Sequence, residues 1–156
     1  MKTHLASSSA VLLVALAMPA ASRASTDDLP LLEAAVRWGL TQTHVDGAHN
    51  VYLQIEAGDP PAELMTRLSD LTVLRPVSEC PHREAYGKSW PDPPTGSVVL
   101  NVWDVVRKSK SVAVIRIGHS EGPTSGIACQ EFFERQKGGW MHRARRNNET
   151  QECGVA

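Results

Sequence analysis

Apolar residues return at helical spacing in two segments of the N-terminal half. Residues 27–43 (DDLPLLEAAVRWGLTQT) predict an α-helix, because their apolar positions recur every three or four residues and form one face, at Leu29, Leu32, Val36 and Leu40. Pro30 falls in the first turn, where its missing N–H leaves no hydrogen bond unmade. Residues 60–71 (PPAELMTRLSDL) predict a second, shorter helix whose apolar face carries Leu64, Leu68 and Leu71.

Alternation of apolar and polar residues predicts strands elsewhere. Residues 51–56 (VYLQIE) alternate in this way, and residues 72–77 (TVLRPV) predict a short strand that Pro76 confines to an edge or an end. Residues 78–96 are rich in proline and glycine and predict a loop. Four further strands are predicted at residues 97–107, 111–119, 127–136 and 140–146. The short links between them favour antiparallel neighbours in a meander.

The order of these elements predicts the fold class. A helix, a strand, a second helix and a second strand precede the four C-terminal strands. Such an order favours an α+β fold, in which the N-terminal helices pack on a curved antiparallel β-sheet. The meander of four strands forms the C-terminal end of that sheet.

The first 24 residues have the order of a secretory signal peptide. A basic start at Lys2 is followed by the apolar run AVLLVALA, and small residues lead to Ala24. The run is much shorter than the about 20 apolar residues that cross a bilayer. We expect residues 1–24 to be cleaved, with cleavage after Ala20 or Ala21 as the alternative. Residues 25–146 then form a single α+β domain, residues 147–156 a polar tail, and the protein is exported to the periplasm or the extracellular medium.

The charge of the predicted mature chain narrows the classes of partner. The whole chain has a formal net charge of −1, and loss of Lys2 and Arg23 with the signal peptide changes it to −3. A mildly acidic chain is a poor candidate for nucleic-acid binding, which draws on clustered positive charge. No second apolar segment approaches membrane-spanning length, and no motif indicates a cofactor. We therefore expect no nucleic-acid partner, no membrane insertion after signal removal and no cofactor.

Three cysteines, Cys80, Cys129 and Cys153, remain in the predicted mature chain. In an oxidising compartment two of them are expected to pair. Cys80 lies in a predicted loop and Cys153 in the polar tail, whereas Cys129 lies in an apolar strand, where a free cysteine acts as a small buried residue. We favour a Cys80–Cys153 disulfide that ties down the tail, with Cys80–Cys129 as the alternative.

The segment FFERQKGGWMHR resembles the final hairpin of small exported bacterial domains with a cystatin-like or nuclear-transport-factor-2-like cone fold. In those domains an apolar strand runs through charged residues to a Gly-Gly turn, then to a Trp that packs back on the sheet. The matching positions here are Phe133, Gly138, Gly139 and Trp140. The resemblance covers most of residues 27–146. Because the family includes both enzymes and non-catalytic binding domains, the resemblance implies a fold and leaves the function open.

The stretch THVDGAHN contains a candidate metal cluster, His44, Asp46 and His49. A zinc site needs three or four converging ligands, and two histidines on one helical face are spaced four residues apart. His44 and His49 are five apart with an Asp-Gly turn between them. We therefore interpret the stretch as a helix end followed by a turn, and expect no metal.

Asp104 is the candidate acid or base. In SVVLNVWDVVR it falls on the same predicted face as Val102 and Val106, where a buried carboxylate would have a raised pKa. The alternative is a position at the end or edge of the sheet, paired with Arg116 on the next strand. A thiolate pair of Cys129 with His119 or His142 is a weaker candidate, because exported thiols tend to be oxidised.

A basic cluster between Arg135 and Arg146 is the clearest charge feature. Its candidate binding residues are Arg143, Arg145 and Arg146. Such a cluster is either a solvated outer face or a contact surface for an acidic partner.

These patterns predict an exported, non-enzymatic binding protein. Its ligand is either a small molecule on the concave side of the sheet or a protein partner, as for an inhibitor or immunity protein against a cell-envelope enzyme. The alternative is a small cone-fold enzyme that uses Asp104 with a pocket histidine.

Overall fold

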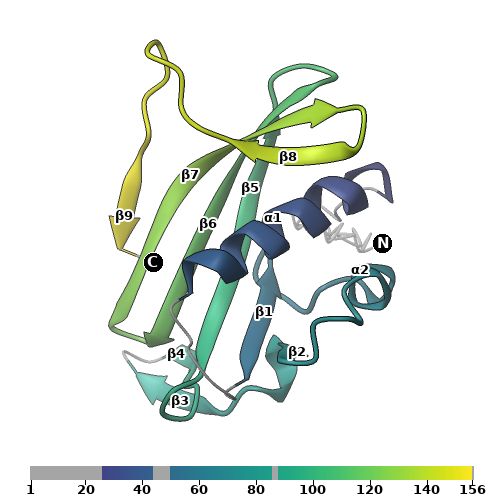
Figure 1. The fold of residues 1–156 in the computed structure, drawn as a ribbon. Helices are drawn as coiled ribbons and strands as arrows, with labels where there is room; N and C mark the ends of the chain where they lie inside the picture. Colours follow the sequence, from purple (N-terminus) through teal and green to yellow (C-terminus); the bar gives the residue numbers. More distant parts are fainter. Residues whose placement is uncertain (1–25, 44–49, 86–87, 156) are drawn as a thin grey trace, which may run out of the picture.

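The computed structural model describes residues 26–43, 50–85 and 88–155 (Figure 1). Its helical segments are η1 (Thr26–Asp28), α1 (Leu29–Gln42), α2 (Ala62–Arg67) and η2 (Val77–Glu79). Its strands are β1 (Val51–Ile55), β2 (Leu74–Pro76), β3 (His82–Ala85), β4 (Lys88–Pro91), β5 (Val98–Arg107), β6 (Val112–Gly122), β7 (Ser125–Gln136), β8 (Gly139–Arg143) and β9 (Cys153–Val155).

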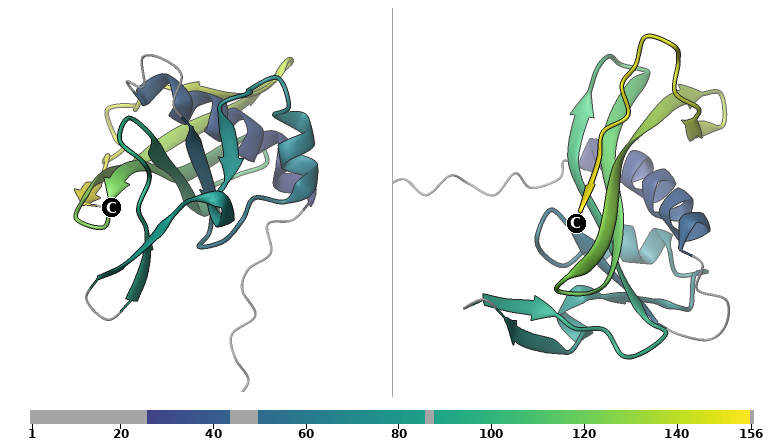
Figure 2. Two further views of the ribbon diagram at one scale, coloured as in Figure 1. Left: turned by 90° about the horizontal axis from the view of Figure 1, so that it is seen from below. Right: turned by 90° about the vertical axis from the view of Figure 1, so that its left-hand side faces the viewer.

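One mixed sheet forms the body of the protein, in the order β2-β1-β5-β6-β7-β8, and β9 pairs with β7. The strands β5, β6, β7 and β8 follow one another as antiparallel neighbours. In contrast, β1 runs parallel to both β2 and β5. A parallel pair needs a crossover connection, and α2 lies on the crossover between β1 and β2. The sheet curls into a half barrel around α1 (Figure 2).

The main core lies between α1 and the enclosed face of the sheet. Leu32 and Val36 of α1 pack in one cluster with Leu100, Ile115 and other aliphatic residues of the sheet. Helix and sheet approach closely at Gly39, where an added Cβ would lie 2.9 Å from Leu100 Cδ1. The glycine thus permits the spacing at which α1 fills the inside of the curl.

The predicted α+β fold, with N-terminal helices packed on a curved antiparallel sheet, is wrong. The structure is mostly β, with 48% strand and 21% helix and a curled half-barrel sheet. α1 is the only long helix in the described part of the chain, because the helical part of residues 60–71 is reduced to the six residues of α2. The antiparallel succession of the four C-terminal strands is confirmed, but β1 and β2 extend the sheet in parallel.

The proline-rich segment 78–96 was predicted to be a loop, but it contains a hairpin. Strands β3 and β4 pair with each other and form a separate two-stranded sheet. Its cross-strand partners include Arg83 with Trp90 and Glu84 with Ser89. The hairpin matters for the site below because it brings Trp90 towards the outer face of the main sheet.

The polar tail is tied by a disulfide, but the bond joins Cys129 to Cys153. These residues lie opposite each other in the pairing of β7 with β9. The predicted Cys80–Cys153 pair and its alternative, Cys80–Cys129, are therefore both wrong. Cys80 is buried beside Tyr52 and Val99, and this burial raises the pKa of its thiol. Its apolar contacts, rather than a disulfide, hold it in place.

Some predictions concern segments that the structure does not describe. The signal peptide, residues 1–24, lies outside the described residues, and so do His44, Asp46 and His49. Among the described helices, none has the length and apolar composition that a membrane span requires. Cleavage, export and the domain boundaries at residues 25 and 146 stay predictions.

Candidate ligand-binding groove

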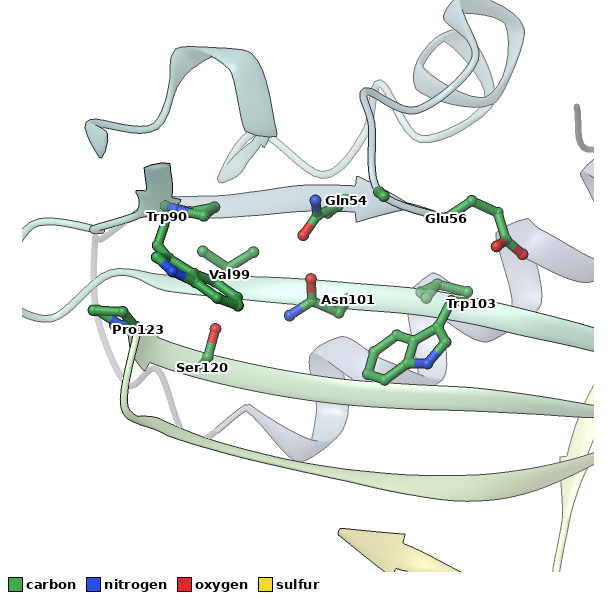
Figure 3. A pocket seen from close by; sticks show the side chains of 12 residues that line it. Gln54, Glu56, Trp90, Val99, Asn101, Trp103, Ser120 and Pro123 are labelled. Carbon is green, nitrogen blue, oxygen red and sulfur yellow. The ribbon is translucent and has the colours of Figure 1, made fainter. Parts of the chain in front are cut away.

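The face of the sheet opposite α1 carries a cavity of about 320 Å³. It lies over β1, β5 and β6 and is closed at its sides by β4, by the turn after β1 and by the turn between β6 and β7 (Figure 3). Twelve residues line it: Gln54, Glu56, Ala57, Trp90, Pro91, Val99, Asn101, Val102, Trp103, Ser120, Gly122 and Pro123. We call this cavity the tryptophan groove.

Strand alternation places the floor of the tryptophan groove. Val98, Leu100 and Val102 face α1, so Val99, Asn101 and Trp103 point to the outer face. The register of the sheet then sets Gln54 of β1 beside Asn101. It also sets Ser120 of β6 opposite Val99. The floor is therefore a row of two amides and a hydroxyl beside one aliphatic side chain.

The polar groups of this floor have no partners within the described protein. The side chains of Gln54, Asn101 and Ser120 make no hydrogen bond or ion pair with any other described residue. Each amide offers two N–H donors and one carbonyl acceptor, and a hydroxyl can do either. A polar molecule on the outer face can use all of these groups.

Two indole rings border the floor. Trp90 comes from β4 and Trp103 from β5, and the amides of Gln54 and Asn101 lie between them (Figure 3). Trp90 is 37% exposed. Pro91 and Pro123 complete the apolar border next to Trp90. The tryptophan groove thus combines apolar walls with a polar floor.

The turn after β1 places Glu56 at the end of the groove next to Trp103 (Figure 3). The turn is tight, because the backbone N–H of Ile55 donates to the carbonyl of Gly58 and the N–H of Gly58 to that of Ile55, each at 3.0 Å. Its central residues, Glu56 and Ala57, have φ values of 57° and 129°. Such turns normally carry Asn-Gly, because L side chains rarely adopt positive φ. The backbone is therefore strained where it presents this carboxylate.

A second cavity of about 710 Å³ lies on the same face, further along β6 and β7. We call it the tail cavity, because Glu149 and Thr150 of the C-terminal tail form one wall. Val114 and Phe132 lie on its floor with Arg116 and Gln130, and Glu56 borders both cavities.

An ion pair holds Glu149 in the wall of the tail cavity. Both Arg143 guanidinium Nη atoms donate to the Glu149 carboxylate, at 2.7 Å and 2.5 Å, and the backbone N–H of Arg146 donates to it at 2.8 Å. The Arg143 guanidinium lowers the pKa of Glu149 to about 2, and the carboxylate in turn raises the pKa of Arg143. Arg143 also lies 5.2 Å from the ring centroid of Phe132, within the range of a cation–π contact.

Two of the three candidate binding arginines in the predicted basic cluster are paired with carboxylates. Arg143 is paired with Glu149, and Arg146 with Glu134 at 3.1 Å. Arg145 is exposed and makes no ion pair with another described residue. The use of these arginines as a binding surface stays a prediction. The sequence pattern did not show that Glu149 of the tail pairs with Arg143, or that Glu134 of β7 pairs with Arg146.

Asp104 does not lie on the buried face where alternation placed it. A β-bulge interrupts the pairing of β5 with β6 between Trp103 and Val106, and Asp104 has a φ of 53°. Beyond the bulge Val105 packs against the core, while Val106 is 45% exposed. The Asp104 side chain is 60% exposed and lies 3.7 Å from the Arg116 guanidinium. The pairing with Arg116 that the alternative interpretation expected is present, but Asp104 lies in a bulge of an interior strand rather than at an edge or an end of the sheet.

The other candidate residues, Cys129, His119 and His142, do not line either of the two cavities. Cys129 is consumed by the disulfide, so it provides no thiolate. His142 stacks on Trp38 with a centroid distance of 3.6 Å and lies 2.8 Å from the Glu131 carboxylate. No histidine of the described chain lines the tryptophan groove or the tail cavity. Among residues 26–43, 50–85 and 88–155, no three His, Cys, Asp or Glu side chains gather as metal ligands would.

The tryptophan groove itself was not predicted from the sequence. Its floor residues Gln54 and Asn101 are the polar positions of two strands, and Trp103 lies two positions from Asn101 on the same face. That alternation was the available signal. It could not indicate that β1 and β5 lie side by side, or that Trp90 comes from a hairpin outside the main sheet.

Comparison of the chain with protein-family models, with curated proteins and with solved structures finds no match. The resemblance to cystatin-like and nuclear-transport-factor-2-like domains stays a prediction that these comparisons do not support.

Proposed function

We propose that the protein is an exported, non-enzymatic binding protein that holds a carbohydrate in the tryptophan groove. The observation that carries the proposal is the row of unpaired amides, Gln54 and Asn101, between the indole rings of Trp90 and Trp103. The cavity volume, about 320 Å³, lies at the lower end of the range usual for small-molecule sites, roughly 300–1,000 Å³.

The chemistry of the groove matches that of a sugar ring. A pyranose has an apolar C–H face that packs well on an aromatic ring, and hydroxyl groups at its rim that both donate and accept hydrogen bonds. Indole rings supply a large apolar surface at little cost in side-chain entropy. The neutral amides and the Ser120 hydroxyl offer donors and acceptors together. A charged ligand would find only Glu56 as an ionic partner among the described lining residues.

The small number of ionisable residues in the tryptophan groove favours binding over catalysis. Most glycoside hydrolases use a pair of carboxylates that flank the scissile bond. Glu56 is the only ionisable residue among the described residues that line the tryptophan groove. The use of Asp104 as an acid or base stays a prediction that its exposed position does not favour.

Export is supported by the Cys129–Cys153 disulfide, because such bonds persist in oxidising compartments. A protein partner, as for an inhibitor or immunity protein, stays a prediction. Co-purification from the cell envelope tests it, and no feature of the described surface supports it as directly as the groove supports a sugar.

The test is calorimetric titration with a panel of neutral mono- and disaccharides, with tryptophan fluorescence as a second readout. Trp90→Ala and Trp103→Ala should each weaken binding about tenfold, because a lost stacking contact is worth about 1–3 kcal/mol in a comparable aromatic site. Trp90→Phe should retain most of the affinity. Met141→Ala, an exposed apolar position on β8, is the matched control and should bind like the wild type. Absence of binding to every sugar in the panel, or wild-type affinity in both alanine variants, would overturn the proposal.

A further inference from the structure

We infer that the tryptophan groove and the tail cavity form one elongated site, so that the ligand is a chain of several sugar units rather than a single ring. This inference rests on the proposed function. The two cavities meet at Glu56, which borders both. Trp103 lines the first and its neighbour Asp104 the second, so the bulge in β5 marks the boundary between them.

Strand register shows that both cavities lie on one face of the sheet. Trp103 is the cross-strand partner of Arg116, which lines the tail cavity. Directly opposed residues of paired strands point to the same face. Arg116 pairs in turn with Gln130, another lining residue of the tail cavity. A ligand leaving the tryptophan groove beside Trp103 therefore passes directly onto the floor of the tail cavity.

The floor of the tail cavity has the same mixed character as that of the tryptophan groove. Val114 and Phe132 offer apolar surface, and Gln130, Arg116 and Asp104 offer donors and acceptors around it. Arg116 holds Asp104 only loosely, at 3.7 Å, and both side chains are partly exposed. A hydroxyl group can come between them without breaking a buried ion pair.

The outer wall of the tail cavity is held in place by the disulfide. Beside Cys129, the backbone N–H of Gln130 donates to the carbonyl of Glu152 at 2.9 Å. The Gln130 side-chain amide donates to the Glu152 carboxylate at 3.1 Å. The chain between these contacts and Arg143 includes Glu149 and Thr150, the wall residues. Release of Cys153 should therefore loosen the wall and leave the tryptophan groove unchanged.

The experiment compares short and long ligands. The probes are the dimer and the hexamer of β-1,4-linked N-acetylglucosamine and of β-1,4-linked glucose, titrated calorimetrically into the full chain. In at least one of the two series, the wild type should bind the hexamer at least tenfold more tightly than the dimer, and failure to bind either series would overturn the elongated site. The double variant Cys129→Ser/Cys153→Ser should lose that advantage and keep its dimer affinity. Arg116→Ala, at a partly exposed position on the floor of the tail cavity and outside the core, should reduce only hexamer binding.

The outcomes separate the two proposals. Equal affinity of the wild type for dimer and hexamer, or a hexamer advantage that survives both variants, would overturn the elongated site while dimer binding still supports the tryptophan groove. If Trp90→Ala did not weaken hexamer binding, the tryptophan groove would not be part of the site that holds the hexamer. Circular dichroism of each variant confirms that the fold is retained, and Arg116→Ala decides the question if the cysteine variant unfolds.

Discussion

The two faces of β5 carry different kinds of residue, although they belong to one strand. Towards α1 it presents Val98, Leu100 and Val102, each at most 5% exposed. Towards the opposite side it presents Asn101 and Trp103, which are only partly buried. The inner face forms the core and stabilises the fold, whereas the outer face leaves hydrogen-bonding groups unpaired next to two cavities. Polar groups left unpaired on a rigid sheet reduce stability slightly and are available to a ligand.

The largest expected effect on stability comes from a truncation on the core face of the sheet, which we compare with a truncation on the outer face. Phe133 is fully buried in the core cluster, and Phe133→Ala should lower the free energy of unfolding by about 3–5 kcal/mol, because it leaves a cavity. Trp103→Ala should cost less stability and instead weaken ligand binding about tenfold. Urea unfolding measures the first and calorimetry the second. Equal loss of stability in both variants would contradict the conclusion that the inner face stabilises the fold and the outer face binds the ligand.

The disulfide should have the next largest effect. It closes a loop of 24 residues at the edge of the sheet, and Cys129→Ser/Cys153→Ser should lower the free energy of unfolding by about 3 kcal/mol if loop entropy dominates. Cys80→Ala removes a buried thiol without opening a loop and serves as the control. Thermal unfolding under non-reducing conditions measures the stability of the two variants against that of the wild type. A Cys80→Ala variant as unstable as the double variant would show that loop closure is not the cause.

Gly118 tests the outer face of the sheet further, because that face is closely packed at this position although it is open at the two cavities. At Gly118 an added Cβ would lie 2.7 Å from the Cβ of Ala128 and 2.7 Å from the carbonyl oxygen of Ile127. Gly118→Ala should therefore lower the free energy of unfolding by about 1–3 kcal/mol through overpacking. Gly138→Ala, with no atom within 4 Å of the added Cβ, should be nearly neutral. Similar urea midpoints for the two variants would contradict this close contact between β6 and β7.

A smaller effect, of opposite sign, is expected at the strained turn. Ala57 has a φ of 129°, which glycine adopts without strain. Ala57→Gly should raise the free energy of unfolding by about 1 kcal/mol, which is the lower end of the strain stored at such positions. Chemical denaturation measures the gain, and Gly58→Ala in the same turn controls for the mere change of residue. A loss of stability in Ala57→Gly would show that the turn is relaxed.

The smallest effect concerns the acid sensitivity of the tail. The pKa of Glu149 is lowered from 4.5 to about 2 by Arg143, so its ion pair stabilises the fold above pH 4.5. This contribution should fall progressively between pH 4.5 and pH 2, because the carboxylate of the folded state then becomes protonated. Glu149→Gln should be less stable than the wild type at pH 7 and equally stable near pH 2. A difference in thermal midpoint that is constant over this range would refute the assignment.

Prediction from the sequence succeeded where one local pattern decides the structure. The helical spacing of Leu32 and Val36 predicted α1, and alternation predicted β1 and the antiparallel strands β5 to β8. Prediction failed where one extra residue in a strand reverses the alternation of its two faces. Asp104 sits in a bulge, so every later position of β5 faces the opposite way from the predicted one. It failed also at Cys80, whose loop-like surroundings concealed a buried position.

The sequence by itself determined α1, β1 and the strands β5 to β8, and which of their side chains share a face up to the bulge in β5, because these follow from the local periods of about 3.6 and 2 residues. The tertiary structure alone decided which strands that are distant in the chain become neighbours, since their pairing depends on how the whole core packs. It set β1 beside β5, Cys153 opposite Cys129, and Trp90 above a floor from other strands. The tryptophan groove belongs to this second category, because only the fold brings β1 and β4 to the hairpin of β5 and β6.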